Sequence, residues 1–167
     1  MRERLGVGFG ASLPFLVGAA ANTAGGYLTD HLVRRFGLRW GRRIPAICGL
    51  TAAALFLTVA TLTRNNALSL IALALSFGAA DLILAVCWAT CIDLGRHNAG
   101  AVSGVMNSLG QVGGMVSPYL LGWLLERSGS WTLPLLLSAA YYLVSAALWF
   151  WIDPEKGVDT YSTSVTR

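Results

Sequence analysis

The chain has 167 residues, of which 55% are hydrophobic and only 12% are charged, and its mean hydropathy is +0.61. Soluble domains carry about 25% charged residues, so this composition excludes an ordinary soluble domain and indicates lipid as the solvent. The net charge of +4 does not indicate a nucleic-acid partner, because the basic residues lie in short gaps between apolar runs.

Five apolar runs each come near the roughly 20 residues that cross a hydrocarbon core of about 30 Å. A lipid-exposed backbone must satisfy its own hydrogen bonds, and the runs lack the alternation of a barrel strand, so we expect helices. The predicted fold is all-α, a multi-pass transmembrane helical bundle over residues 1–153, followed by a disordered cytoplasmic tail over 154–167. The predicted spans are residues 6–29, 44–63, 67–92, 98–125 and 131–152.

The gap between the first two spans, residues 30–43, is predicted to be a cytoplasmic loop. It holds five arginines, whereas the turns at 63–66 and 125–130 hold one each. By the positive-inside rule, the N-terminus then lies outside and the C-terminus in the cytoplasm. The basic residues divide into an inner set (34, 35, 39, 42, 43, 96, 156 and 167) and an outer set (2, 4, 64 and 127).

A motif at this first exit from the membrane predicts a conformational gate. Gly26 would let a neighbouring helix approach closely, and Asp30 could meet the N-terminus of a partner helix or an arginine. Arg34 and Arg35 complete the predicted gate loop. Such a cluster can hold an interface closed on one side of the membrane and release it during a conformational change. The alternative is a plain basic loop that only sets the topology.

Asp81 is the one ionisable residue within a span, near the middle of 67–92. An intramembrane carboxylate costs at least about 2.5–3.5 kcal/mol at a helix centre, so it should face the bundle interior. It could couple transport to protons, or it could make a structural hydrogen bond to a neighbouring helix. Trp88 lies seven residues further on the same face and could contact a solute or anchor the helix at the membrane interface.

The fourth span carries polar and small residues on one helical face. Positions 103, 107, 110, 111 and 114 recur at helical spacing, and their residues are Ser103, Asn107, Gly110, Gln111 and Gly114. Because polar groups are costly against lipid, this face should look into protein or water. It predicts solute contact by Asn107, Gln111 and Ser103, with helix packing through the glycines as the alternative.

These segments resemble a known superfamily of transporters. The run from Gly26 to Arg35 resembles the signature cytoplasmic loop of the major facilitator superfamily, although His31 and Val33 depart from the usual basic residue and glycine. Residues 91–118 resemble the link between helices 10 and 11, and helix 11, of its anion:cation symporter family. The first span, with its Ser12-Leu-Pro14-Phe15 run, resembles helix 8 there.

That resemblance implies that the five spans are helices 8 to 12. Members of the family typically carry organic anions such as sugar acids, often with protons, and the asparagine that matches Asn107 lines their substrate site. A helix-10 tryptophan contacts solute there, which Trp88 matches. Helix 7, the N-terminal half and a cation to neutralise the anion would be missing, since no arginine or lysine lies within a span.

Enzymatic and metal-dependent functions find no support in the sequence. It contains no HExxH, P-loop or GxSxG motif and no paired intramembrane carboxylates. Cys48, Cys87 and Cys91 lie inside the spans without metal spacing, so we expect them to pack as small apolar residues and predict no cofactor.

The sequence therefore predicts the C-terminal fragment of a secondary transporter, a proton-coupled (or sodium-coupled) symporter of organic anions that should not transport alone. The expected partners are the lipid bilayer, a small organic anion and the missing N-terminal half. One alternative is a half-transporter that needs a partner chain. Another is a small membrane scaffold or regulatory subunit without transport.

Overall fold

The computed structural model describes residues 2–157, with side-chain environments from residue 16 onward. All regular structure in this range is helical, which confirms the predicted all-α class. The tail residues 158–167 lie outside the described residues. The elements are α1 (Arg2–Leu62), α2 (Asn66–Gly95), the short 3-10 helix η1 (Arg96–Asn98), α3 (Ala99–Ser128) and α4 (Thr132–Leu148).

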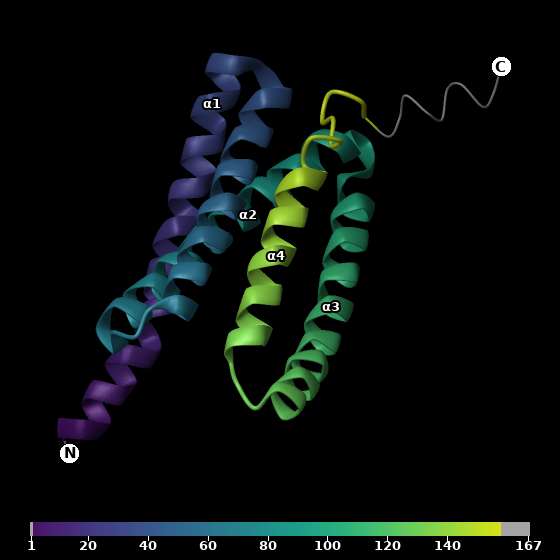
Figure 1. Cartoon of the computed structure of the whole chain (residues 1–167). Helices are drawn as coiled ribbons and strands as arrows, with labels where there is room; N and C mark the ends of the chain where they lie inside the picture. The colour runs from purple at the N-terminus through teal and green to yellow at the C-terminus, as the bar shows by residue number, and fades with distance from the viewer. Residues whose placement is uncertain (1, 158–167) are drawn as a thin grey trace.

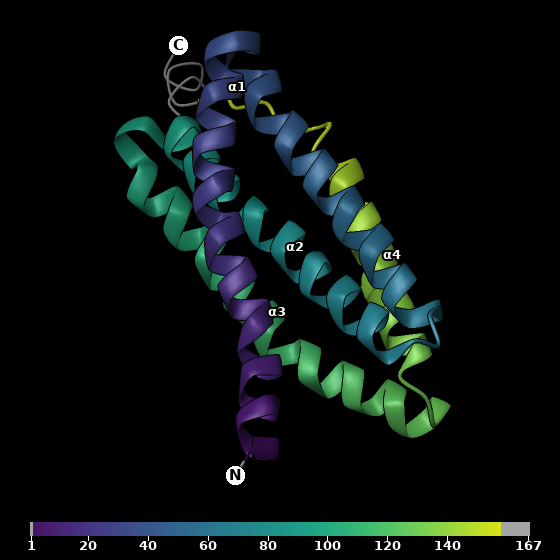
Figure 2. The same cartoon turned by 90° about the vertical axis from the view of Figure 1, so that its left-hand side faces the viewer.

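Helix α1 consists of two antiparallel halves that meet at a reversal of the chain and diverge away from it (Figures 1 and 2). The reversal occurs at Gly37, whose φ of 81° and ψ of 169° are not helical. Residues 30–43 were expected to be a loop, and the structure corrects this, because they are helical on both sides of Gly37. A glycine accepts this backbone conformation without steric cost, so one residue can replace a long loop.

The remaining connections are also short, and they join the five helical segments into an up-and-down bundle (Figures 1 and 2). Asn65 caps α2 by accepting hydrogen bonds from the backbone N–H groups of Ala67 and Leu68, at 3.0 and 3.3 Å. Gly129 ends α3 in the left-handed conformation, with φ 62°. Each predicted span therefore corresponds to one helical segment, with shifted ends.

The last span is shorter than expected. Helix α4 ends at Leu148 rather than at residue 152, because the chain tightens there into turns with i→i−3 hydrogen bonds from Phe150 and Trp151. Pro154, expected at the start of a disordered tail, is buried. The segment 149–157 therefore packs against the end of the bundle.

Helix α2 is the centre of the packing and lies between the two halves of α1. A Cβ added to Gly25 would lie 2.4 Å from the carbonyl oxygen of Leu82, so the first half approaches α2 backbone to backbone. On the other side, the Ser76 hydroxyl donates to the Ala53 carbonyl at 2.8 Å. Small residues thus permit two close helix contacts, as is common in membrane bundles.

The main apolar core joins the second half of α1, α2 and the end of α4. Its buried members are Ala46, Leu50, Ile83, Val86, Ala146 and Trp149. Helix α3 contributes no buried residue at all within the described structure. The bundle therefore has a compact body and one helix, α3, that stands at its side (Figure 2).

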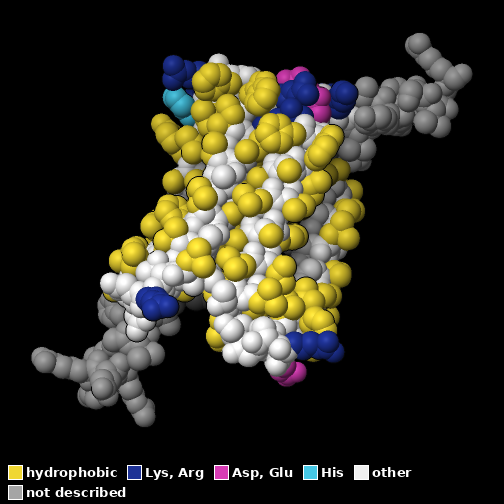
Figure 3. Space-filling model, in the orientation of Figure 1, with side chains coloured by type: hydrophobic (Ala, Val, Ile, Leu, Met, Phe, Trp, Pro, Cys, Tyr) yellow, Lys and Arg dark blue, Asp and Glu magenta, His cyan; other side chains and the backbone are white. Residues whose placement is uncertain are grey.

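The surface has the distribution of a membrane protein. Two continuous helical stretches, Leu16–Leu62 and Asn66–Ser128, are long and apolar enough to cross a membrane, and Thr132–Leu148 is a shorter apolar helix. On the face shown in Figure 3, charged side chains gather at the two ends and the band between them is apolar. The described residues of the predicted inner set lie at the end that holds Gly37, η1 and segment 149–157.

Candidate functional site

The predicted polar face of α3 lies at the surface of this chain. Asn107 and Gln111 are exposed, and Ser103 is half-buried. Cβ atoms added to Gly110 or Gly114 would meet nothing within 4 Å. The helix therefore presents two amides and a row of glycines at the surface of the described structure.

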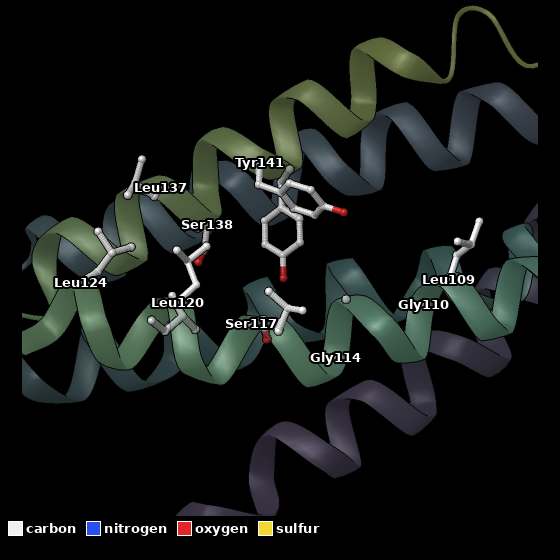
Figure 4. Close-up of a pocket in the computed structure, with 13 residues that line it drawn as sticks. Leu109, Gly110, Gly114, Ser117, Leu120, Leu124, Leu137, Ser138 and Tyr141 are labelled. Carbon is white, nitrogen blue, oxygen red and sulfur yellow. The ribbon is translucent and has the colours of Figure 1, made fainter.

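A groove of about 690 Å³ lies between α3 and α4, next to this polar face. Leucines and glycines make up most of the wall, and the hydroxyls of Ser117, Ser138, Tyr141 and Tyr142 add polar groups. The labelled side chains of the two helices face each other across it (Figure 4). Ligand sites are commonly apolar with a few placed polar groups, so this groove has the right character for one.

The groove is not lined by any of the residues that were predicted to contact solute. Gly110 and Gly114 line it, whereas Asn107, Gln111 and Ser103 do not. The sequence reasoning missed the α4 side of the groove. The signal was present, because Ser138 and Tyr141 stand three residues apart on an apolar helix and so share one face.

Trp88 lies on α2, and its side chain is 40% exposed. No hydrogen bond among the described residues connects it to Asn107 or Gln111. The structure therefore brings the predicted solute residues to the surface of two different helices without joining them by direct contact.

The Asp81 carboxylate is half-buried between α2 and the first half of α1. A Cβ added to Gly18 would lie 2.5 Å from Asp81 Oδ2, so the backbone of α1 passes directly over the carboxylate. Tyr142 of α4 is within its electrostatic reach. Among the described residues, Asp81 takes part in none of the side-chain hydrogen bonds or ion pairs.

The predicted gate residues are arranged differently from expectation. Asp30 accepts a hydrogen bond at 3.0 Å from Arg42 Nη1, and Arg42 Nε donates to Asp93 Oδ2 at 2.8 Å. Arg42 also donates to Thr29 Oγ1 at 3.2 Å. The arginine that meets Asp30 is therefore Arg42, whose guanidinium ties both halves of α1 to the end of α2.

The other gate residues have separate positions. Gly26 is half-buried and faces α2, since a Cβ there would lie 3.9 Å from the Ala85 Cβ. Arg34 and Arg35 are exposed, and neither pairs with Asp30. Sequence reasoning missed Arg42 and Asp93 because they are far apart along the chain, although their charge and their positions at helix ends were visible.

The segment after α4 closes the same end of the bundle. Arg43 Nε donates to the Ile152 carbonyl at 2.8 Å, and Arg39 Nε lies 3.9 Å from Asp153 Oδ2. Together with buried Pro154, these contacts fix the end of α4 to the second half of α1.

The described residues contain no cluster of three or more His, Cys, Asp or Glu side chains that could hold a metal ion. Cys91 is buried, and its sulfur contacts the sulfur of Met106 at 3.2 Å. The described side chains at and near the groove offer amides, hydroxyls and apolar walls, and Asp81 is the one carboxylate within the predicted spans.

Comparisons with known proteins agree with this character. The sequence model of the Major Facilitator Superfamily matches residues 1–164. A probable sulfoacetate transporter, SauU, of Cupriavidus necator is 37% identical over 150 residues, which cover 89% of this chain and 35% of that protein.

Two further relatives are named as transporters of sugar acids. A hexuronate transporter of Bacillus subtilis is 27% identical over 130 residues, covering 75% of this chain and 31% of its own length. A probable galactarate/D-glucarate transporter, GarP, of Escherichia coli is 27% identical over 150 residues, which cover 89% of this chain and 33% of that protein. The chain thus spans about a third of the length of these relatives.

Proposed function

Because the chain belongs to the Major Facilitator Superfamily, we propose that it forms part of the C-terminal helical bundle of a secondary transporter of organic anions. The relatives are membrane transporters and not enzymes. Their named solutes are a sulfonated carboxylate and sugar acids, which are small anions with several oxygen acceptors. We assign the five helical segments to helices 8 to 12 of that bundle.

The observation that carries this proposal is the unburied polar face of α3. Asn107 and Gln111 would be costly if they faced lipid, so a water-filled cavity or another part of the transporter must cover them. Superfamily transporters hold the solute near the middle of the membrane between two helical halves. In this proposal α3 is one wall of that cavity, and Asn107 donates its amide N–H to the anion.

A complete transporter needs the opposite wall and a cation to neutralise the anion. The spans of this chain contain no arginine or lysine. The chain matches only about a third of each relative, so we propose that the remaining helices and the cation come from an N-terminal half. In the same proposal, the end that holds Gly37 faces the cytoplasm of a bacterial inner membrane, and transport is coupled to protons through Asp81.

A chimera tests the proposal directly. Residues 1–157 would replace the matching third of the Cupriavidus necator relative, and uptake of radiolabelled sulfoacetate would be measured in membrane vesicles. We expect uptake by the chimera. Asn107→Ala should raise its KM about tenfold, because a hydrogen bond to a charged group contributes about 1.5–3 kcal/mol.

Ser108→Ala is the matched control, since Ser108 is exposed on the same helix but points about 100° away from Asn107. It should leave the KM unchanged. A well-expressed chimera with no uptake would contradict the assignment of this chain to such a transporter. An unchanged KM in Asn107→Ala would remove Asn107 from the site.

A further inference from the structure

The five arginines around the Gly37 reversal differ in whether their guanidinium groups have a hydrogen-bond or ion-pair partner within this chain. Arg42 is 7% exposed and binds the carboxylates of Asp30 and Asp93. Arg43 is 4% exposed and donates to a backbone carbonyl, and Arg39 lies near Asp153. These three side chains stabilise the end of the bundle.

Arg34 and Arg35 are different, because both are exposed and neither has a carboxylate partner within the described residues. Asp30 stands one helical turn before Arg34, where it could pair with it, but Arg42 already occupies that carboxylate. Both guanidiniums therefore lie at the last turn of the first half of α1 without a carboxylate partner among the described residues. Their charge is not explained by the folding of this chain.

Two exposed aromatic rings lie at the same reversal, Phe36 next to Arg35 and Trp40 next to Arg43. Phe36 is 52% exposed, and Arg35 Cζ lies 5.7 Å from its ring centre. Trp40, just past the reversal, is 49% exposed. Exposed aromatic rings at the end of a transmembrane bundle are typical of the membrane interface, where lipid headgroups lie. Two guanidiniums without a carboxylate partner among the described residues therefore lie at the end of the bundle that carries these exposed rings, and one of them, Arg35, lies over the Phe36 ring.

We propose that Arg34 and Arg35 form a binding site for the headgroup phosphate of an anionic phospholipid, with Phe36 and Trp40 packed against its glycerol and upper acyl region. A guanidinium binds a phosphate through two parallel N–H donors, and arginine is weakly hydrated compared with lysine. Membrane leaflets rich in anionic lipid attract such basic positions. This inference does not rest on transport.

The other end of the bundle supplies a matched comparison. Arg64 and Arg127 are also two exposed arginines, but they belong to separate turns. Arg127 stacks on Trp123 at 4.7 Å and follows Glu126 directly in the chain. The double variant R64Q/R127Q thus removes the same charge as R34Q/R35Q without touching the proposed site.

Native mass spectrometry of the purified chain in detergent tests the proposal, with titration of phosphatidylglycerol and of zwitterionic phosphatidylcholine. We expect the wild type to bind phosphatidylglycerol in preference to phosphatidylcholine. R34Q/R35Q should lose about 10-fold to 25-fold in affinity for it, about fivefold for each guanidinium, while R64Q/R127Q stays close to the wild type. Circular dichroism of each variant checks that the helices are retained.

Equal affinity of R34Q/R35Q and the wild type would overturn the proposal, and so would equal losses in both double variants. Inorganic phosphate at millimolar concentration serves as a competitor. If inorganic phosphate binds as tightly as phosphatidylglycerol, the site is one for free phosphate, and the lipid assignment is wrong. If a variant misfolds, lipid binding by the wild type is measured at increasing salt concentration. Binding between the guanidiniums and the headgroup phosphate must weaken as salt rises, because salt screens their charges.

Discussion

At the scale of single residues, Gly18 and Asp81 show how a missing side chain makes room for a charged one. Gly18 is buried, and its backbone passes over the Asp81 carboxylate of α2. The added Cβ would also meet the Phe77 ring at 2.8 Å. Such contacts are closer than real Cβ atoms permit, so a larger residue fits only if the Asp81 and Phe77 side chains, or the helices that carry them, shift.

We predict that Gly18→Ala destabilises the chain by about 1–3 kcal/mol, the usual cost of overpacking a close contact. Thermal unfolding of the purified chain in detergent measures this. Gly110→Ala is the control, because its Cβ would point into open space and alanine is the better helix former. Equal unfolding temperatures for the two variants would contradict the close contact at Gly18.

At the scale of elements, Arg42 is the side chain that connects helices at the charged end. It joins Thr29 and Asp30 of the first half of α1 to Asp93 of α2, while it belongs itself to the second half. Neighbouring Arg43 adds the end of α4 through the Ile152 carbonyl. Helix α3 is outside this network. The compact body of the bundle is therefore held at this end by charge-assisted hydrogen bonds as well as by its apolar core.

Arg42→Met should lower stability by an amount at the lower end of about 3–5 kcal/mol, the range for removing one partner of a buried ion pair. The lower end applies because the Asp30 side chain is 63% exposed and remains hydrated. The loss should appear in detergent-solubilised protein as a lower unfolding temperature. Arg34→Met, at an exposed position, should change stability by no more than about 0.5 kcal/mol. If both substitutions had the same small effect, Arg42 would not stabilise the bundle.

At the scale of the whole molecule, the body and α3 have different roles in the proposed transporter. The body carries a titratable carboxylate between α1 and α2, and α3 carries the amides that would contact solute. Alternating access requires one bundle to rock against another around the solute. Proton coupling would require Asp81 to gain and lose its proton during that motion.

We predict that Asp81→Asn in the chimera abolishes accumulation of sulfoacetate driven by a pH gradient, while exchange of labelled for unlabelled solute continues. The amide keeps the shape of the carboxylate but cannot carry the proton. Uptake in vesicles with and without an imposed gradient, beside a counterflow assay, separates the two activities. Retained gradient-driven uptake, or loss of the folded protein, would assign Asp81 a structural role.

Much of the architecture followed from hydrophobic runs and arginine positions. A backbone in lipid must satisfy its own hydrogen bonds, and few structures do this. The all-α bundle could therefore be predicted from the sequence. The gate was predicted only in part. Gly26 does approach α2, but the partner of Asp30 is Arg42 and not Arg34 or Arg35. Local spacing cannot reveal such a pairing, because Gly37 reverses the chain and brings distant turns together.

The sequence by itself determined the solvent, the helical class and the family resemblance, because these depend on composition, run length and local motifs. Only the tertiary structure decided which polar residues find partners inside the chain and which stay exposed at its surface. Arg42 and Asp93 satisfy each other, whereas Asn107, Gln111, Arg34 and Arg35 stay at the surface. The physical reason is that burial and pairing depend on how whole helices pack, and residues far apart in the chain become neighbours only then.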